Sequence, residues 1–246
     1  MTRQTSRRVR VSVSALAMLF AASTLASAPA LGSETPTVGN SQSPIDIRDG
    51  DVTYVEHLPQ LNIKYGTTDV HVQNTGSPYH EASVKISPEN KDLYITVQGE
   101  KWPLAQFHWH TESEHLRNGK PYIMEGHFVH KQDDGDLLVI GVFVEEGDYN
   151  KALAPLFKDL PTSNQSAEVQ DVRLDRILPE DLDSYRYNGS LTTHPYTEPV
   201  NWIVLDEPIE MSRTQITEFA KLFPEHNLRE PQPLNGRTIL SDVDND

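Results

Sequence analysis

Residues 106–130, QFHWHTESEHLRNGKPYIMEGHFVH, contain the densest group of potential metal ligands in the chain and predict its local fold. His108 and His110 are two residues apart, so both imidazoles would point to the same face of a β-strand. The aromatic and β-branched residues around them favour strands. Asn118-Gly119, between the two apolar runs, is a strong hairpin signal. A returning antiparallel strand would therefore place His127 beside the first two histidines.

Three imidazoles on one face leave a fourth coordination position open, as in a catalytic zinc site rather than a closed structural one. Gln106 and Glu125 each precede a histidine by two residues, so each can accept a proton from that histidine's second ring nitrogen. Glu114 lies nearby, where the first strand ends. The chain has no cysteine, which excludes thiolate ligands and iron–sulfur clusters. The alternative is that these histidines are surface or core residues, which is the usual role of an isolated His-x-His pair.

Residues 1–30 differ in composition from the rest of the chain. Four arginines precede a mostly apolar run over residues 11–25, and Ala28-Pro29-Ala30 fits a signal-peptidase cleavage site. This pattern predicts an export signal that is too short for a membrane span, so we expect a periplasmic or secreted protein. Residues 31–246 are long enough for one domain with a sizeable core, which we expect to be the catalytic domain.

The charge of the chain excludes one class of partner. The net charge is −15, and without residues 1–30 Lys+Arg falls from 21 to 17 against 36 Asp+Glu, which gives −19. Such a protein repels phosphate backbones, so nucleic-acid binding is not expected. No later stretch is long and apolar enough to cross a bilayer, and we expect the partner to be a small-molecule substrate.

Short apolar alternations bounded by turn residues predict strands at 61–65, 70–73, 82–86, 93–98 and 200–205. Residues 137–144 are almost continuously apolar, which suits a central strand buried on both faces. Helices are predicted at 149–160, interrupted by Pro155, at 179–185 as a short turn, and at 212–223. Ser212 would cap the last helix, with Gln215 completing a capping box. Many short strands and few helices predict a mainly β protein dominated by one sheet.

Six motifs in order resemble those of the α-class carbonic anhydrases: QSPIDI at 42–47, QFHWH at 106–110, SEH at 113–115, EGHFVH at 125–130, GSLTTHP at 189–195 and NWIVL at 201–205. The resemblance runs from about residue 40 to about residue 240. It implies a large, mostly antiparallel twisted sheet with a few short peripheral helices and a conical cavity with zinc at its base. The implied reaction is the reversible hydration of carbon dioxide to bicarbonate and a proton by zinc-bound hydroxide.

The resemblance also implies a role for individual residues. The zinc ligands would be His108, His110 and His127, supported by Gln106, Glu125 and the backbone carbonyl of Asn227. Thr192 would accept the proton of the hydroxide and donate its own to Glu114, while Thr193 would orient water or bicarbonate. Carbon dioxide would lie in an apolar pocket formed by Val129, Val139, Leu191 and Trp202. His115 would be a buried structural residue.

The chain also departs from the family pattern. Ser77 follows the turn where a proton-shuttling histidine is usual, so we expect either that His80 replaces it or that His80 is a surface residue. Tyr196 replaces a common cysteine, and the segment before Gln42 is unusually short. One rival interpretation is a weakly active or inactive member of the fold that serves as a binding module, although such proteins typically lose a ligand histidine. Another rival interpretation is a cupin-like metal enzyme, because Glu114 follows the His-x-His pair at a spacing that partly resembles the cupin metal-binding motif.

Overall fold

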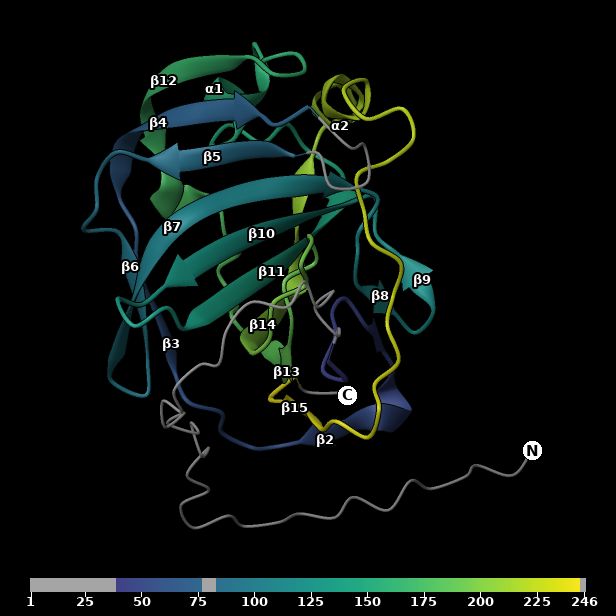
Figure 1. The fold of residues 1–246 in the computed structure, drawn as a ribbon. Helices are drawn as coiled ribbons and strands as arrows, with labels where there is room; N and C mark the ends of the chain where they lie inside the picture. The colour runs from purple at the N-terminus through teal and green to yellow at the C-terminus, as the bar shows by residue number, and fades with distance from the viewer. Residues whose placement is uncertain (1–38, 77–82, 244–246) are drawn as a thin grey trace, which may run out of the picture. The chain divides into compact units, whose positions relative to one another are not determined.

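The computed structural model describes residues 39–76 and 83–243, and within them the strands build a twelve-stranded twisted sheet (Figure 1). The main path of this sheet runs β12-β4-β5-β7-β10-β11-β14-β13-β15-β2; off this path, β6 pairs with β7 and β3 pairs with β6. Most neighbouring strands are antiparallel, while β11 with β14 and β15 with β2 are parallel. The predicted mainly β, sheet-dominated class is confirmed. The predicted export signal and His80 lie outside the described residues.

The centre of the sheet is made by β7 (Glu100–Thr111), β10 (Met124–Lys131), β11 (Leu137–Glu146) and β14 (Val200–Met211). β10 pairs antiparallel with both β7 and β11, and its register places His127 opposite His108. Most of β11 is buried, because it lies between β10 and β14 with both of its faces covered. The predicted central strand at 137–144 and the predicted return of His127 to the first histidines are therefore confirmed.

The outer strands match the predicted ones in part. β3 (Leu61–Lys64), β4 (Thr67–Asn74), β5 (Val84–Pro88) and β6 (Tyr94–Val97) lie where apolar alternation indicated strands. Other strands were not predicted: β12 (Ser166–Arg173), β13 (Ser184–Gly189), β15 (Ile239–Ser241), β2 (Val52–Tyr54) and β1 (Asp46–Ile47). β12 and β2 lie at the two ends of the sheet path with mostly exposed side chains, so they lack the apolar alternation that reveals a half-buried strand.

The helices are short and lie outside the sheet. α2 (Arg213–Ala220) begins at the predicted cap, with Ser212 and Gln215 forming the reciprocal capping box. Only Ala154–Phe157 of the region predicted as a helix at 149–160 is helical, as α1, with Pro155 in its first turn, where proline is tolerated. The predicted turn of helix at 179–185 is wrong. A 3-10 turn, η3 (Leu174–Arg176), precedes that region, and β13 begins at Ser184.

The Asn118-Gly119 turn closes a smaller hairpin than the sequence suggested. It joins β8 (Leu116–Arg117) to β9 (Lys120–Pro121), with φ values of +52° and +76° at its two central residues. Positive φ at both positions is the reason for the Asn-Gly preference in such turns. The hairpin lies within the connection between β7 and β10, and β1 pairs with β8 beside it. The antiparallel return of β10 is thus correct, but Asn118-Gly119 is not the turn directly joining it to β7.

Two apolar clusters occupy opposite faces of the central strands. Phe128 on β10 and Ile140 on β11 belong to the larger cluster. Their neighbours along the same strands, Val129 and Val139, belong to the smaller one. Because side chains alternate along a strand, one face of β10 and β11 carries the main core and the other carries the histidines. Among the described residues, no helix is long and apolar enough to cross a membrane.

Candidate metal centre

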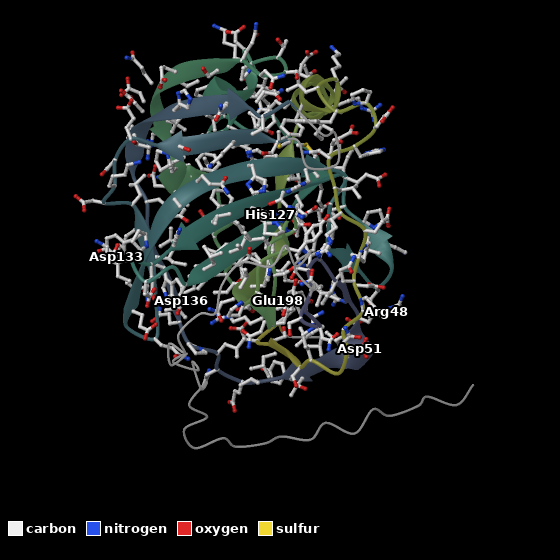
Figure 2. All side chains as sticks on the ribbon, viewed as in Figure 1. Arg48, Asp51, His127, Asp133, Asp136 and Glu198 are labelled. Atoms are coloured by element: carbon white, nitrogen blue, oxygen red, sulfur yellow. The ribbon has the colours of Figure 1, made fainter. Side chains whose placement is uncertain are left out.

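His108, His110 and His127 converge on one face of the sheet. One ring nitrogen from each lies within 4.8 Å of those of the other two. The ring centroids are 4.6 Å to 5.3 Å apart. Two of the rings come from alternate positions of β7, and the third comes from the residue of β10 that faces His108 across the ladder. Figure 2 shows His127 over the central strands, away from Asp133 and Asp136 in the turn after β10.

Each histidine uses one ring nitrogen to donate to a fixed acceptor. His108 Nδ1 donates to Gln106 Oε1 at 3.0 Å, and His127 Nε2 donates to Glu125 Oε1 at 2.9 Å. His110 Nδ1 donates to the backbone oxygen of Asn227 at 2.5 Å. A neutral imidazole that donates through one nitrogen has a lone pair on the other. The three acceptors therefore leave Nε2 of His108, Nε2 of His110 and Nδ1 of His127 available for a metal.

Two buried polar atoms at this centre indicate that a metal ion fits there. His110 Nε2 and Glu114 Oε2 have no hydrogen-bond partner, although both atoms are buried. They lie 3.5 Å apart, and Glu114 Oε2 is also 3.7 Å from His127 Nδ1. Buried polar atoms are normally paired, so an unpaired imidazole nitrogen beside an unpaired carboxylate oxygen suits a bound cation. A donor set of three imidazoles without thiolates fits zinc.

The electrostatics of the site favour neutral imidazoles on β7. Burial lowers the pKa of His108 well below its ordinary value, and the neighbouring His110 and His127 lower it further. Burial also lowers the pKa of His110, against the opposing effect of Glu114. Burial acts to raise the pKa of Glu125, but His115 and His127 lower it well below its ordinary value, so this carboxylate stays ionised. Neutral imidazoles and an ionised acceptor are the protonation states that metal ligation needs.

Two of the three histidines, His108 and His127, line a cavity of about 140 Å³. Pockets for drug-sized ligands measure roughly 300–1,000 Å³, so this cavity suits a smaller substrate. The cavity is lined by the four residues predicted for an apolar pocket, Val129, Val139, Leu191 and Trp202. The predicted Thr192 and Thr193 also line it. Leu137, at the start of β11, also lines the cavity and was not predicted. Its apolar character was assigned entirely to strand burial, although strand parity places it on the face of Val139.

Glu114 lies beside His110 and His127, but no hydrogen bond joins its carboxylate to Thr192 in the structure. Its Oε1 accepts from the backbone N–H of Arg229 at 2.7 Å, and Oε2 has no partner among the described residues. Thr192 lies in the loop between β13 and β14 and is 6% exposed. The predicted donation from Thr192 to Glu114 therefore stays a prediction.

His115 forms part of a second cluster of possible ligands with Glu125 and His127. Both of its ring nitrogens are already used: Nδ1 donates to Glu125 Oε1 at 2.7 Å, and Nε2 accepts from the Tyr187 hydroxyl at 2.6 Å. No lone pair of His115 remains for a metal. His115 instead helps to hold Glu125, the acceptor of His127, in place. The double use of Glu125 was not predicted, because strand parity connects Glu125 to His127 but does not indicate that His115 folds back onto it.

Comparisons with known proteins agree with this geometry. Residues 32–243 match the sequence profile of the eukaryotic-type carbonic anhydrase family. A carbonic anhydrase from Pectobacterium carotovorum is 40% identical over 207 residues, which cover 82% of this chain and 80% of that protein. The structure is similar to that of an α-carbonic anhydrase from Thermovibrio ammonificans in complex with the inhibitor sulfanilamide, at 38% identity and a TM-score of 0.76 over 82% of this chain and 88% of that one. It is also similar to dioscorin complexed with ascorbate, at 26% identity and a TM-score of 0.74 over 82% and 86% of the two chains.

Proposed function

Because this chain belongs to the α-carbonic anhydrase family, we propose that His108, His110 and His127 hold the zinc ion with which it reversibly hydrates carbon dioxide to bicarbonate and a proton. The observation that carries the proposal is the convergence of three imidazoles, each with its second nitrogen bound to a separate acceptor. When bound, zinc supplies the Lewis acidity that makes hydroxide available from water near neutral pH. Neutral ligands suit this role because they leave the charge of the ion undiminished.

The remaining residues of the cavity orient the reactants. Thr192, with its hydroxyl proton directed to Glu114 Oε2, would present an oxygen lone pair to the attacking hydroxide and align it. Val129, Val139 and Trp202 would hold carbon dioxide by apolar contact and exclude competing water from that side. Thr193 would orient the bicarbonate product as water replaces it. A proton must then leave the cavity, and we propose His80 as the relay, since Ser77 cannot titrate near neutral pH.

Stopped-flow measurement of carbon dioxide hydration tests the proposal on purified protein that has been expressed from the full-length sequence. The zinc-loaded protein should accelerate hydration, a chelator should remove the activity, and added zinc should restore it. His108→Ala should abolish the activity, whereas His57→Ala, at an exposed position remote in sequence from every ligand, should not change it. Zinc-loaded protein that hydrates carbon dioxide no faster than buffer alone would favour the binding-module interpretation.

The relay requires a separate test. His80→Ala should lower turnover in weak buffer, and added imidazole should restore it, because a small diffusible base can carry the proton instead. Unchanged turnover in weak buffer would exclude His80 as the relay.

The site of action is also a proposal. Residues 1–30 would direct export and be removed after Ala30, which would place the enzyme in the periplasm or outside the cell. Mass spectrometry of the protein from a cell-envelope fraction measures the mature N-terminus. An uncleaved chain retained in the cytoplasm would contradict this localisation.

A further inference from the structure

The segment that follows α2 connects parts of the chain that are distant in sequence. In Figure 1 it is the yellow segment that leads from α2 to β15. Within it, half-buried Arg229 contacts Glu114 through its backbone, and Gln42, Ser43 and Tyr196 through its side chain. We propose that Arg229 is a positioning residue that sets the Glu114 carboxylate against the loop carrying Thr192. This inference rests on the proposed function and assigns the residue that aligns its two proton-handling groups.

The backbone of Arg229 determines how the carboxylate is turned. Its N–H donates to Glu114 Oε1 at 2.7 Å, and this bond leaves Oε2 as the oxygen that faces the imidazoles of His110 and His127. Glu114 is buried, with only 2% of the residue exposed. A displacement of Arg229 would therefore rotate or withdraw the one oxygen that is available to Thr192.

The side chain of Arg229 holds the other half of this arrangement. Nη1 donates to Gln42 Oε1 at 2.8 Å and to the backbone oxygen of Ser43 at 2.7 Å. The guanidinium carbon lies 3.7 Å from the centre of the Tyr196 ring, a stacked cation–π contact. The planar guanidinium can make these contacts together, which the point charge of a lysine cannot.

The residues that the Arg229 side chain contacts, Gln42, Ser43 and Tyr196, either belong to the loop at residues 190–199 or form hydrogen bonds with it. Gln42 Nε2 donates to the backbone oxygen of Tyr196 at 3.3 Å and also to Glu198 Oε1, which accepts from the backbone N–H of Ser41 at 3.0 Å. The hydroxyls of Ser43 and Ser190 each accept from the other residue's backbone N–H. Thr192 lies between these two anchor points of the loop.

Geometry explains why this support should affect the reaction. Alignment of the hydroxyl of Thr192 with Glu114 requires a hydrogen-bond distance, and a misplacement of about 1 Å in such a group can lower the rate on the order of 100-fold. The backbone of Arg229 contacts Glu114, and its side chain contacts the residues that hold the loop carrying Thr192. If Arg229 had only a structural role, replacing it would lower the stability of the protein without lowering turnover per folded molecule.

The test compares Arg229→Ala and Arg229→Lys with Arg237→Ala as a matched control. Arg237 is also a half-buried arginine of the same segment that donates to backbone carbonyls and lies over a tyrosine ring. None of its hydrogen bonds in the described part of the chain reaches Glu114, Gln42 or the loop at 190–199. We expect kcat/KM of Arg229→Ala to fall about 10- to 100-fold at unchanged zinc content, and that of Arg237→Ala to change less than about twofold.

Amide hydrogen exchange of the metal-free protein supplies a readout that is independent of activity. Residues 190–199 should exchange faster in Arg229→Ala than in the unchanged protein, and no faster in Arg237→Ala. Tyr196→Ala, which removes the ring that stacks on Arg229 and contacts His194, should reproduce a smaller part of the effect, and Tyr196→Phe should not. These two variants and Arg229→Lys keep the proposal testable if Arg229→Ala does not fold.

Two results would overturn the inference. One is equal loss of kcat/KM in the Arg229 and Arg237 variants, and the other is unchanged exchange of residues 190–199 without Arg229. Failure of the proposed function looks different: the unchanged zinc-loaded protein would itself be inactive, while the exchange experiment would still decide whether Arg229 braces the loop.

Discussion

Two histidines three residues apart on β10 lie in opposite electrostatic environments. Burial acts to lower the pKa of His127, but Glu125 reverses this effect and raises it. His130, on the other face, has no carboxylate partner among the residues that the structure describes, and burial lowers its pKa to about 3. His130 Nδ1 donates to the backbone oxygen of Leu138, so Nε2 accepts from the Tyr65 hydroxyl. At the scale of the residue, the partner of each imidazole decides its chemistry.

The environment of His130 predicts how stability changes with pH. Its folded pKa of about 3 lies below the ordinary value of 6.5, so the unfolded chain binds the proton first as the pH falls. The stability that this neutral histidine contributes is present above pH 6.5 and is lost between pH 6.5 and pH 3. From pH 7 to pH 5 the loss should be about 2 kcal/mol.

Urea unfolding of metal-free protein at both pH values measures this loss, with His130→Gln as the comparison. Subtracting the variant's pH dependence cancels the contribution of the metal-binding histidines, which both proteins share. A variant with the same pH dependence as the unchanged protein would contradict the prediction.

The acceptor of His108 gives a second prediction at this scale. Gln106→Leu keeps the approximate size of the side chain but removes the oxygen that fixes the imidazole at 3.0 Å. We expect zinc affinity to fall about 10- to 100-fold, because the ring loses its fixed orientation and tautomer. Competition with a chromophoric chelator measures the affinity. Gln60→Leu, at an exposed position, is the control, and equal affinities of the two variants would disprove the role of Gln106.

At the scale of the element, close packing between β7 and β10 brings the ligands together. Gly126 lies between Glu125 and His127 and pairs with Trp109, the residue between the first two ligands. A Cβ at Gly126 would lie 2.4 Å from the ring of Trp109, which is fully buried. The glycine therefore lets the indole cover β10 on the face opposite the metal ligands.

Gly126→Ala should accordingly destabilise the protein by roughly 1–3 kcal/mol, because the buried ring must move to admit the methyl group. Chemical denaturation measures this change. Gly66→Ala is the matched control, because no atom lies within 4 Å of the Cβ it would add and its effect should stay within about 0.5 kcal/mol. Equal stability of the two variants would mean that the indole relaxes at no cost.

At the scale of the whole molecule, the sheet builds its main core on one face and the metal centre on the other. The apolar cluster beside the centre includes Val139 and Trp202, which also line the cavity, so packed side chains form part of the cavity wall. Neither apolar cluster includes His108, His110 or His127, so the apolar core is built from residues other than the candidate ligands. We therefore expect the protein to fold without zinc and to gain stability when zinc binds.

The size of that gain follows from mass action. Free zinc at 100 times its dissociation constant should raise the free energy of unfolding by about 2.7 kcal/mol. Denaturation with buffered zinc and with a chelator measures the difference. His108→Ala should show little of this dependence on zinc, and an unchanged midpoint for the unaltered protein would contradict a metal centre in the folded state.

Sequence patterns predicted the features that depend on neighbouring residues. Strand parity placed His108, His110, Gln106 and Glu125 on one face, and the Ser212 cap and the Asn118-Gly119 turn formed where their residue types favour them. The helix predicted at 149–160 failed over most of its length, because Pro155 lacks the N–H that a helix interior needs and is tolerated only in a first turn, so the helix cannot run through it from residue 149. β12 was missed because exposed edge residues carry no periodic signal.

The sequence by itself therefore determined which three histidines meet and the class of the fold, since residue parity along each strand is a local property of the chain. Only the tertiary structure decided what surrounds the ligands. The support of His110 by Asn227 spans 117 residues, and it was the family resemblance, not a local pattern, that suggested it. The contacts of Arg229 with Glu114, Gln42 and Tyr196 were not foreseen at all, because they depend on how distant segments pack, and no short-range pattern encodes that packing.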